Sequence, residues 1–266
     1  MDISMPLTFP EGDFRAFGIA ASAFFPSVAS DEALFDPQEK RRQFDWSWQA
    51  VRYRYRGCFE CNGAFKALLD DEASAWWKGG GSDEEVTYKL ERCIYQFFTS
   101  GLSVFDSLAF CLYFYGGALK PDAFPDVSNP RSITWKRTAK AFRRAFPQAA
   151  ITGLLASTPQ DASFHVIDEV RNLLAHRISG RRSIRSSGTL QPDRMHTTDW
   201  HEETWHIPGA AGKLMFDQEL LERQLNDITR LLTSLSSAAR EFAESQKAAK
   251  EAKKAAAQGI LQPRRG

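Results

Sequence analysis

The stretch Lys78-Gly79-Gly80-Gly81-Ser82-Asp83-Glu84-Glu85 separates two long segments that both have the hydrophobic periodicity of helices. Over residues 44–78, apolar side chains recur at steps of three and four, as they do along one face of an amphipathic helix. Consecutive glycines end such a helix, and Ser82-Asp83-Glu84-Glu85 is the capping-box pattern that begins the next one. That second helix is expected to continue to about Tyr115, where Gly116-Gly117 would end it. Two long helices joined by a short turn form an antiparallel hairpin.

The rest of the chain is predicted to add further helices and one insertion. Residues 120–131 contain three prolines and are expected to be a loop, and a helix follows from about Trp135 to Phe146. The sequence Ser157-Thr158-Pro159-Gln160-Asp161 supplies a cap and a first-turn proline for a helix over about 161–178. Residues 181–216 begin polar and basic and then hold scattered Thr, Trp and Ile, which indicates an irregular segment or a β-hairpin.

These elements predict an all-α fold in three parts. Residues 1–43 form an arm of extended or short helical pieces, and residues 44–236 form a helical domain that contains the insertion at about 181–216. The final helix of that domain begins near Asp217 and has a broad stripe of leucine and isoleucine. Residues 237–266 form an Ala/Lys-rich tail that is expected to continue as exposed helix and to fray by Gln262.

Composition limits the classes of protein that the chain can belong to. Its 266 residues are 43% hydrophobic and 25% charged, with a net charge of +1, so a core can form and any anion-binding site must be a local cluster. The four cysteines include the pair Cys58 and Cys61, but no second pair accompanies it, and we expect small buried side chains. The first ten residues do not have the pattern of a secretory signal, so a cytoplasmic location is expected.

One segment has the composition of a membrane span. From Gln96 to Leu119 the only formal charge is that of Asp106. A central aspartate is costly in a bilayer, and the glycine pair at 116–117 also weakens that interpretation. A buried helix of a bundle is favoured, and no membrane partner is expected.

The helix expected over 161–178 places its polar residues on one side. On a helical wheel, one half is apolar and consists of Phe164, Val166, Ile167, Val170, Leu173, Leu174 and Ile178. His165, Asn172 and His176 lie on the other half, beside Asp168 and Glu169. Arg171 is at the edge of the apolar half, from which its guanidinium can reach solvent. The two histidines are therefore expected to point away from the core.

The segment Arg171-Asn172-Leu173-Leu174-Ala175-His176 resembles the R-N-x-x-x-H signature of HEPN-domain ribonucleases. Proteins of that superfamily are bundles of four or five helices that carry the motif on the third main helix, and the resemblance covers about 44–235. It implies cleavage of RNA without a metal or another cofactor, with two motifs facing each other in a homodimer. It also implies a role as a toxin or in defence against phage, with an antitoxin or defence protein as a possible partner.

The residue types suit that chemistry independently of the family. Cleavage of RNA by its own 2′-OH needs a base, an acid and a group that stabilises the charged phosphorane. A histidine such as His176 titrates near neutral pH, and an arginine such as Arg171 grips phosphate oxygens in a fork. Asn172 lies one turn before His176, so its amide can orient the imidazole or the phosphate. One histidine cannot easily be both base and acid, which favours a dimer, although His165 could be the second group.

Two further groups are predicted to support the motif. Residues 171–192 contain no acidic side chain, and their arginines form a local cluster that could bind RNA phosphates: Arg177, Arg181, Arg182 and Arg185, besides Arg171. A solvated loop is the alternative for that cluster. Asp106 is expected to be buried and to need a cationic partner, for which Arg171 or His176 is the natural choice and Arg92 an alternative. HEPN nucleases often place an acidic or polar residue there on the second helix.

Three patterns remain open. His196, His201 and His206 recur every five residues near acidic side chains, but this spacing suits no standard metal-ligand set. Arg52, Arg54 and Arg56 alternate with two tyrosines, and a structural role is favoured over nucleic-acid binding because a helix would fan them around several faces. Finally, the alternative to an enzyme is a non-catalytic helical module that binds nucleotide, nucleic acid or a partner protein.

Overall fold

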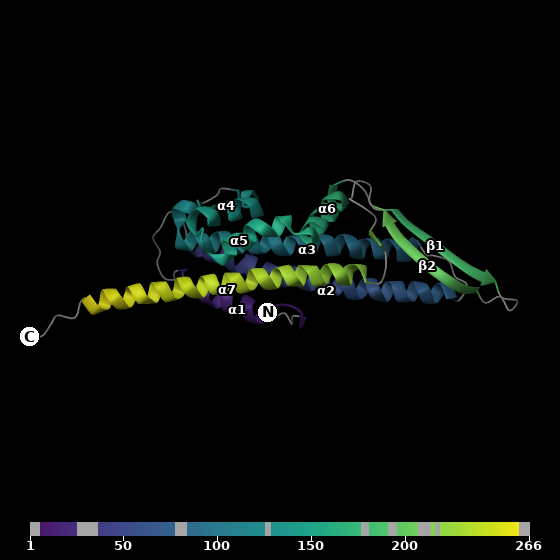
Figure 1. Cartoon of the computed structure of the whole chain (residues 1–266), viewed down its shortest axis with the longest axis horizontal. Coiled ribbons are helices and arrows are strands. Elements are labelled where there is room, and N and C mark those ends of the chain that lie inside the picture. The colour runs from purple at the N-terminus through teal and green to yellow at the C-terminus, as the bar shows by residue number, and fades with distance from the viewer. Residues whose placement is uncertain are drawn as a thin grey trace, which may run out of the picture. The chain divides into compact units, whose positions relative to one another are not determined.

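The computed structural model describes residues 6–25, 37–77, 84–125, 129–176, 181–190, 196–206, 214–215 and 219–260. Side chains are described for residues 6–25, 39–72, 84–125, 129–175 and 219–257. Within these ranges the chain forms seven α-helices: α1 (Glu11–Ser22), α2 (Pro37–Trp77), α3 (Glu84–Leu119), α4 (Trp135–Ala145), α5 (Ala150–Ser157), α6 (Ala162–His176) and α7 (Leu220–Ile260). Three short 3-10 turns lie at Pro121–Ala123, Pro130–Ser132 and Thr158–Gln160. The predicted all-α fold is confirmed (Figure 1).

The predicted hairpin consists of α2 and α3, which run antiparallel. Nη1 of Arg54 donates to the carbonyl oxygen of Ser103 at 2.8 Å, and the Cys58 thiol lies 3.6 Å from the carbonyl oxygen of Phe97. Residue numbers therefore fall along one helix as they rise along the other. The first helix extends to Trp77, and the glycine-rich residues 78–81 that were expected to end it lie outside the described residues.

The predicted end of the second helix was wrong, because α3 continues through Gly116-Gly117 to Leu119. Packing explains the first of these glycines. A Cβ built on Gly116 would lie only 2.4 Å from Cζ of Phe124, whose ring is 1% exposed. The backbone of the helix ends later, where the N–H of Lys120 donates to the carbonyl of Gly116 at 2.8 Å. Gly116 therefore admits an aromatic ring to the surface of the helix and does not end it.

The chain forms two compact units. Unit 1 comprises residues 1–6, 52–104 and 160–229, and unit 2 comprises residues 7–51, 105–159 and 230–266. Helices α2, α3 and α7 each contribute residues to both units. The boundaries that the sequence suggested, after residues 43 and 236, lie inside α2 and α7.

Four helices of unit 1 meet at one glycine of α3. A Cβ on Gly101 would lie 2.9 Å from Cδ1 of Ile228 on α7, 3.6 Å from Cγ2 of Ile167 on α6 and 3.9 Å from the Cys58 sulfur on α2. All three of these neighbours are fully buried. The close approach explains why a residue without a side chain occupies this position.

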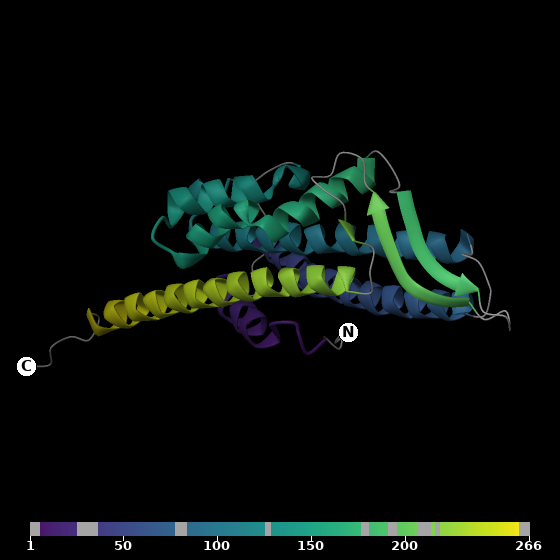
Figure 2. The same ribbon diagram turned by 45° about the vertical axis from the view of Figure 1, so that its right-hand side comes forward.

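Unit 1 also contains a small sheet in the order β1-β2-β3, formed by β1 (Arg181–Leu190), β2 (His196–His206) and β3 (Leu214–Met215). Strands β1 and β2 pair antiparallel from Arg181 with His206 to Leu190 with His196, and Figure 2 shows them side by side. Of the two forms proposed for the insertion, the β-hairpin is confirmed. The strand over residues 181–190 was not predicted, because it has no apolar alternation by which a strand could be recognised.

Unit 2 has a core of aromatic side chains that includes α1, so the expected short helical piece of the arm packs on the body. Phe17 is fully buried against Tyr115 of α3, with ring centroids 5.7 Å apart. Phe14 stacks on Trp48 of α2 at 5.4 Å, and the Trp48 indole N–H donates to the Phe14 carbonyl at 3.3 Å. Each such ring pair contributes about 0.5–1.5 kcal/mol beyond the area that it buries.

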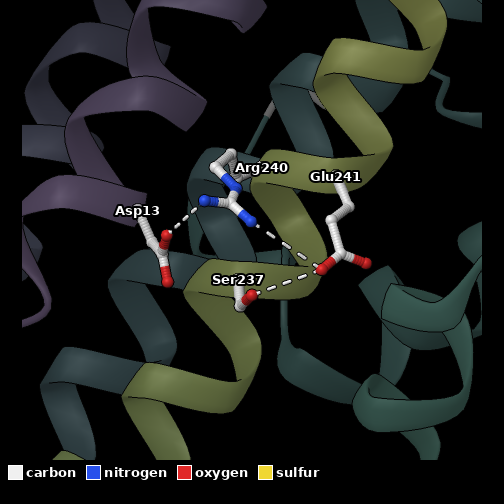
Figure 3. A network of polar contacts seen from close by, with 4 residues as sticks. All are labelled: Asp13, Ser237, Arg240 and Glu241. Atoms are coloured by element: carbon white, nitrogen blue, oxygen red, sulfur yellow. Dashed lines mark hydrogen bonds and ion pairs between the residues drawn. The ribbon is translucent and has the colours of Figure 1, made fainter.

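Charged residues of α7 also contact α1, as Figure 3 shows for Arg240 and Asp13. Nη1 of Arg240 lies 2.8 Å from Oδ1 of Asp13, and its Nη2 lies 3.9 Å from Oε1 of Glu241, which also accepts from the Ser237 hydroxyl at 3.4 Å. Immediately after α1, the carbonyl of Ala23 accepts a hydrogen bond from Nζ of Lys250 at 2.9 Å. The C-terminal segment that the sequence predicted to be helical is thus the continuation of α7.

Helix α3 is long and apolar enough to pass a membrane-span test by length and composition alone. In the structure, 67% of its most apolar window is buried inside the protein. Such burial is typical of a core helix, which is the interpretation that the sequence favoured.

Candidate functional site

Helix α6 carries the motif and begins at a capping aspartate. Oδ1 of Asp161 accepts the N–H of Ser163 at 2.9 Å, and the Asp161 carbonyl accepts the N–H of His165 at 3.0 Å. A side-chain acceptor at this position satisfies a backbone donor that the first helical turn leaves unpaired. The helix start therefore fixes which residues of α6 face the core.

The buried side of α6 agrees with the predicted apolar half. Phe164, Ile167 and Val170 are at most 8% exposed, whereas His165 is exposed, as predicted. Leu174 is only half-buried, so the apolar contact weakens toward the end of the helix. The core residues thus hold α6 by its first turns and leave the polar side available.

A chain of hydrogen bonds connects three polar residues on α6. Nη1 of Arg171 donates to Oδ1 of Asn172 at 2.8 Å, and Nδ2 of Asn172 donates to Oδ1 of Asp168 at 2.9 Å. Asp168 precedes Asn172 by four residues, which is the spacing at which helical side chains meet. Both the oxygen and the nitrogen of the Asn172 amide therefore have partners within α6. The sequence had instead predicted that this amide orients His176 or a phosphate.

Arg171 is half-buried and keeps unused donor capacity. Its Nε atom is buried and forms no hydrogen bond within the part of the chain that the structure describes. Guanidinium has five N–H donors, of which the bond to Asn172 uses one. An arginine arranged in this way can accept an anion without giving up its existing partner.

The histidine of the motif ends the helix. His176 is the last residue of α6, one turn after Asn172, and its side chain lies outside the described residues. Arg177 lies outside them entirely. Three predicted RNA-binding residues belong to β1, where the backbone pairs Arg181 with His206, Arg182 with Trp205 and Arg185 with Glu202. Their side chains, and those of the three histidines of β2, are not among the described ones.

Asp106 is not the buried carboxylate that the sequence predicted. It is exposed on α3 and belongs to unit 2, whereas Arg171 belongs to unit 1. Helix geometry explains the difference, because the buried Phe105 and Leu108 lie on the core-facing side, whereas Asp106 lies about 100° from Phe105 and about 160° from Leu108 around the helix. The predicted burial of Asp106 was therefore wrong, and its pairing with Arg171 or His176 stays a prediction.

Sequence reasoning did not assign a role to Asp168, although the signal was available. An acidic residue four positions before an asparagine predicts this contact on any helix.

Among the described residues, no group of three or more His, Cys, Asp or Glu side chains is arranged to hold a metal ion. Comparisons of the chain with protein-family models, curated proteins and solved structures find no match.

Proposed function

We propose that the protein is a metal-independent endoribonuclease of the HEPN type, with Arg171, Asn172 and His176 as its catalytic residues. The observation that carries the proposal is the hydrogen-bonded chain from Arg171 through Asn172 to Asp168, one turn before His176. It holds a half-buried guanidinium on a helix that is anchored in the core by Phe164, Ile167 and Val170. Such support limits the movement of a charged group and preorganises it for a developing negative charge.

In the proposed reaction, His176 takes the proton of a 2′-OH while the 2′-oxygen attacks the adjacent phosphorus. A bond from the 2′-oxygen to phosphorus forms, the bond from phosphorus to the 5′-oxygen breaks, and a second imidazole gives a proton to the leaving oxygen. Arg171 stabilises the phosphorane through donors not used by Asn172. The products are a 2′,3′-cyclic phosphate and a 5′-hydroxyl.

The second imidazole is proposed to come from a second copy of the chain, because each motif contains one histidine. RNA is then the substrate, and an antitoxin or a defence protein would restrain the enzyme in the cell. His165 is the alternative source, since it is exposed on the same helix.

The test is cleavage of mixed RNA by the purified protein in the presence of EDTA. His176→Ala should lose most activity, because general acid–base catalysis commonly contributes about 10²–10⁴-fold. Arg171→Lys should also be poor, since lysine keeps the charge but loses the planar fork. His165→Ala tests the alternative source, and full activity in it would assign the second imidazole to another copy. Equal cleavage by the wild type and His176→Ala would contradict the proposal.

One observation favours a non-catalytic binding module as the second candidate. Both ends of the Asn172 amide already have partners within α6, as in a purely structural network. If so, the wild type should not cleave RNA, and Arg171→Ala should lower the free energy of unfolding by about 1–3 kcal/mol, because the half-buried Oδ1 of Asn172 loses its donor.

A further inference from the structure

A groove of about 650 Å³ lies between α2 and α3 in unit 1, away from α6. Its walls include Tyr53, Arg54 and Arg56 from α2 and Arg92 and Tyr95 from α3. On α2, the lining extends from Tyr53 to Ala64, which is about 16 Å of helix at about 1.5 Å per residue. The groove is therefore long and open along the hairpin.

The two helices approach each other closely at the floor of this groove. A Cβ on Gly57 would lie 3.4 Å from the hydroxyl oxygen of Ser100, which is tighter than most contacts of a real Cβ. One turn earlier, Arg54 spans the helices by donating to the Ser103 carbonyl at 2.8 Å. Small residues thus lie at the floor, and longer side chains form the walls.

Positive charge dominates the walls. Three guanidinium groups face one carboxylate, that of Glu60, which pairs with Arg56 at 2.6 Å. Arg92 is exposed and has no hydrogen bond or ion pair within the part of the chain that the structure describes. Burial, together with Cys93 and Glu60, raises the pKa of the Cys61 thiol in the groove to about 11, so this thiol is neutral at physiological pH. The groove therefore attracts anions although the whole chain is close to neutral.

Exposed aromatic rings stand on both walls. Tyr53 is 68% exposed and Tyr95 is 43% exposed, so both rings are accessible from solvent. Tyr55, two residues after Tyr53, is fully buried and its hydroxyl bonds Thr229 at 2.6 Å. The alternating Arg and Tyr residues of α2 thus divide between a structural face and a groove face.

We propose that this groove binds single-stranded RNA, with its arginines on the phosphates and the rings of Tyr53 and Tyr95 stacked on bases. Sequence-tolerant binding of single strands combines a cationic groove with aromatic platforms. Nucleotides stack about 3.4 Å apart, so a groove of about 16 Å matches about four or five of them. The choice of RNA over DNA rests on the proposed function. The proposed phosphate and base contacts rest only on the charge and the exposed rings of the groove.

The experiment measures fluorescence anisotropy of a labelled oligouridine about ten nucleotides long. All proteins carry His176→Ala, so that the RNA stays intact. The groove variant Arg92→Ala/Tyr95→Ala is compared with Lys89→Ala/Tyr88→Ala, a matched pair of exposed residues on the same helix that do not line the groove. We expect binding to weaken roughly ten-fold or more in the groove variant and less than about two-fold in the control. The slope of log affinity against log salt should fall by about 0.7 for the lost arginine contact.

Several results would overturn the inference: no binding by the parent protein, equal weakening in both double variants, or tighter binding of duplex RNA or of DNA. A dimer that dissociates in the groove variant, without RNA binding, would assign the groove to a second copy of the chain instead. Cleavage by the wild type is measured separately and reports on α6. Groove-dependent binding without cleavage would contradict the ribonuclease and leave this inference supported.

Discussion

Asn172 contributes geometry to the candidate site more than it contributes reactivity. Its oxygen accepts from Arg171 and its nitrogen donates to Asp168, so a single amide fixes the guanidinium relative to the helix. A group held in advance needs less ordering when a phosphate arrives, and ordering is a large part of the cost of catalysis. The same two bonds also restrict Asn172, which explains why it is a poor candidate for direct contact with His176.

At the scale of single residues, Gly116→Ala should destabilise the protein although alanine is the better helix former. The added Cβ would lie 2.4 Å from the buried Phe124 ring, and overpacking of this kind costs about 1–3 kcal/mol. Gly63→Ala is the control, because a Cβ there meets nothing within 4 Å, and it should stabilise by up to about 1 kcal/mol. Urea unfolding measures both changes, and an equal or higher midpoint for Gly116→Ala would contradict the packing argument.

At the scale of elements, α1 is attached to unit 2 by two kinds of contact. Its apolar face inserts Phe14 and Phe17 among the aromatic rings, while Asp13 pairs with Arg240 at the surface. Burial of two phenylalanines is worth several kcal/mol by area, whereas a partly exposed ion pair is worth about 1 kcal/mol or less. The rings therefore hold α1 in place and the charges fix its orientation.

A double-mutant cycle on Asp13→Asn and Arg240→Gln should give a coupling energy of about 0.5–1 kcal/mol that decreases as salt is added. The side chain of Asp13 is 27% exposed and that of Arg240 is 33% exposed, so water screens the pair only in part. The control cycle uses Glu219 and Arg223, an exposed pair at the start of α7 whose charged atoms are 3.8 Å apart. A coupling energy no larger than that of the control would show that α1 is held by its rings alone.

At the scale of the whole molecule, the proposed chemistry needs two copies. The protein should therefore sediment as a dimer at micromolar concentration. Mixing inactive His176→Ala chains into the wild type should lower activity by more than dilution alone, because a mixed dimer has only one imidazole. A strictly monomeric mass, or a linear loss of activity on mixing, would contradict the two-copy site and direct attention to His165.

Local signals predicted the elements of this molecule well, and tertiary relations poorly. The helices α3 and α4 could be predicted because hydrophobic periodicity and capping residues can be recognised in the local sequence. The exposure of Asp106 could not be predicted, because a run of apolar neighbours does not reveal which side of a helix faces solvent. Tyr53 and Tyr55 illustrate the same limit, because only the phase of α2 against its neighbours separates a groove residue from a core residue.

In the candidate site, the sequence located the helix and its polar side but not the partner of Asn172. The wheel separated Ile167 and Val170 from His165 correctly, because α6 is a regular helix with one packed face. Side-chain pairing within the polar face depends on rotamers, which a wheel does not contain.

The contact between Asp13 and Arg240 joins residues that are 227 positions apart in the sequence, and so does the contact of Lys250 with Ala23. A ribosome adds about 5–20 residues per second, so about 10–45 seconds separate the synthesis of the two sides. During that interval Trp48, only 34 positions beyond Phe14, is already present. Helix α1 can thus pack Phe14 against Trp48 early in translation. Its ion pair with Arg240 forms only after α7 has been synthesised.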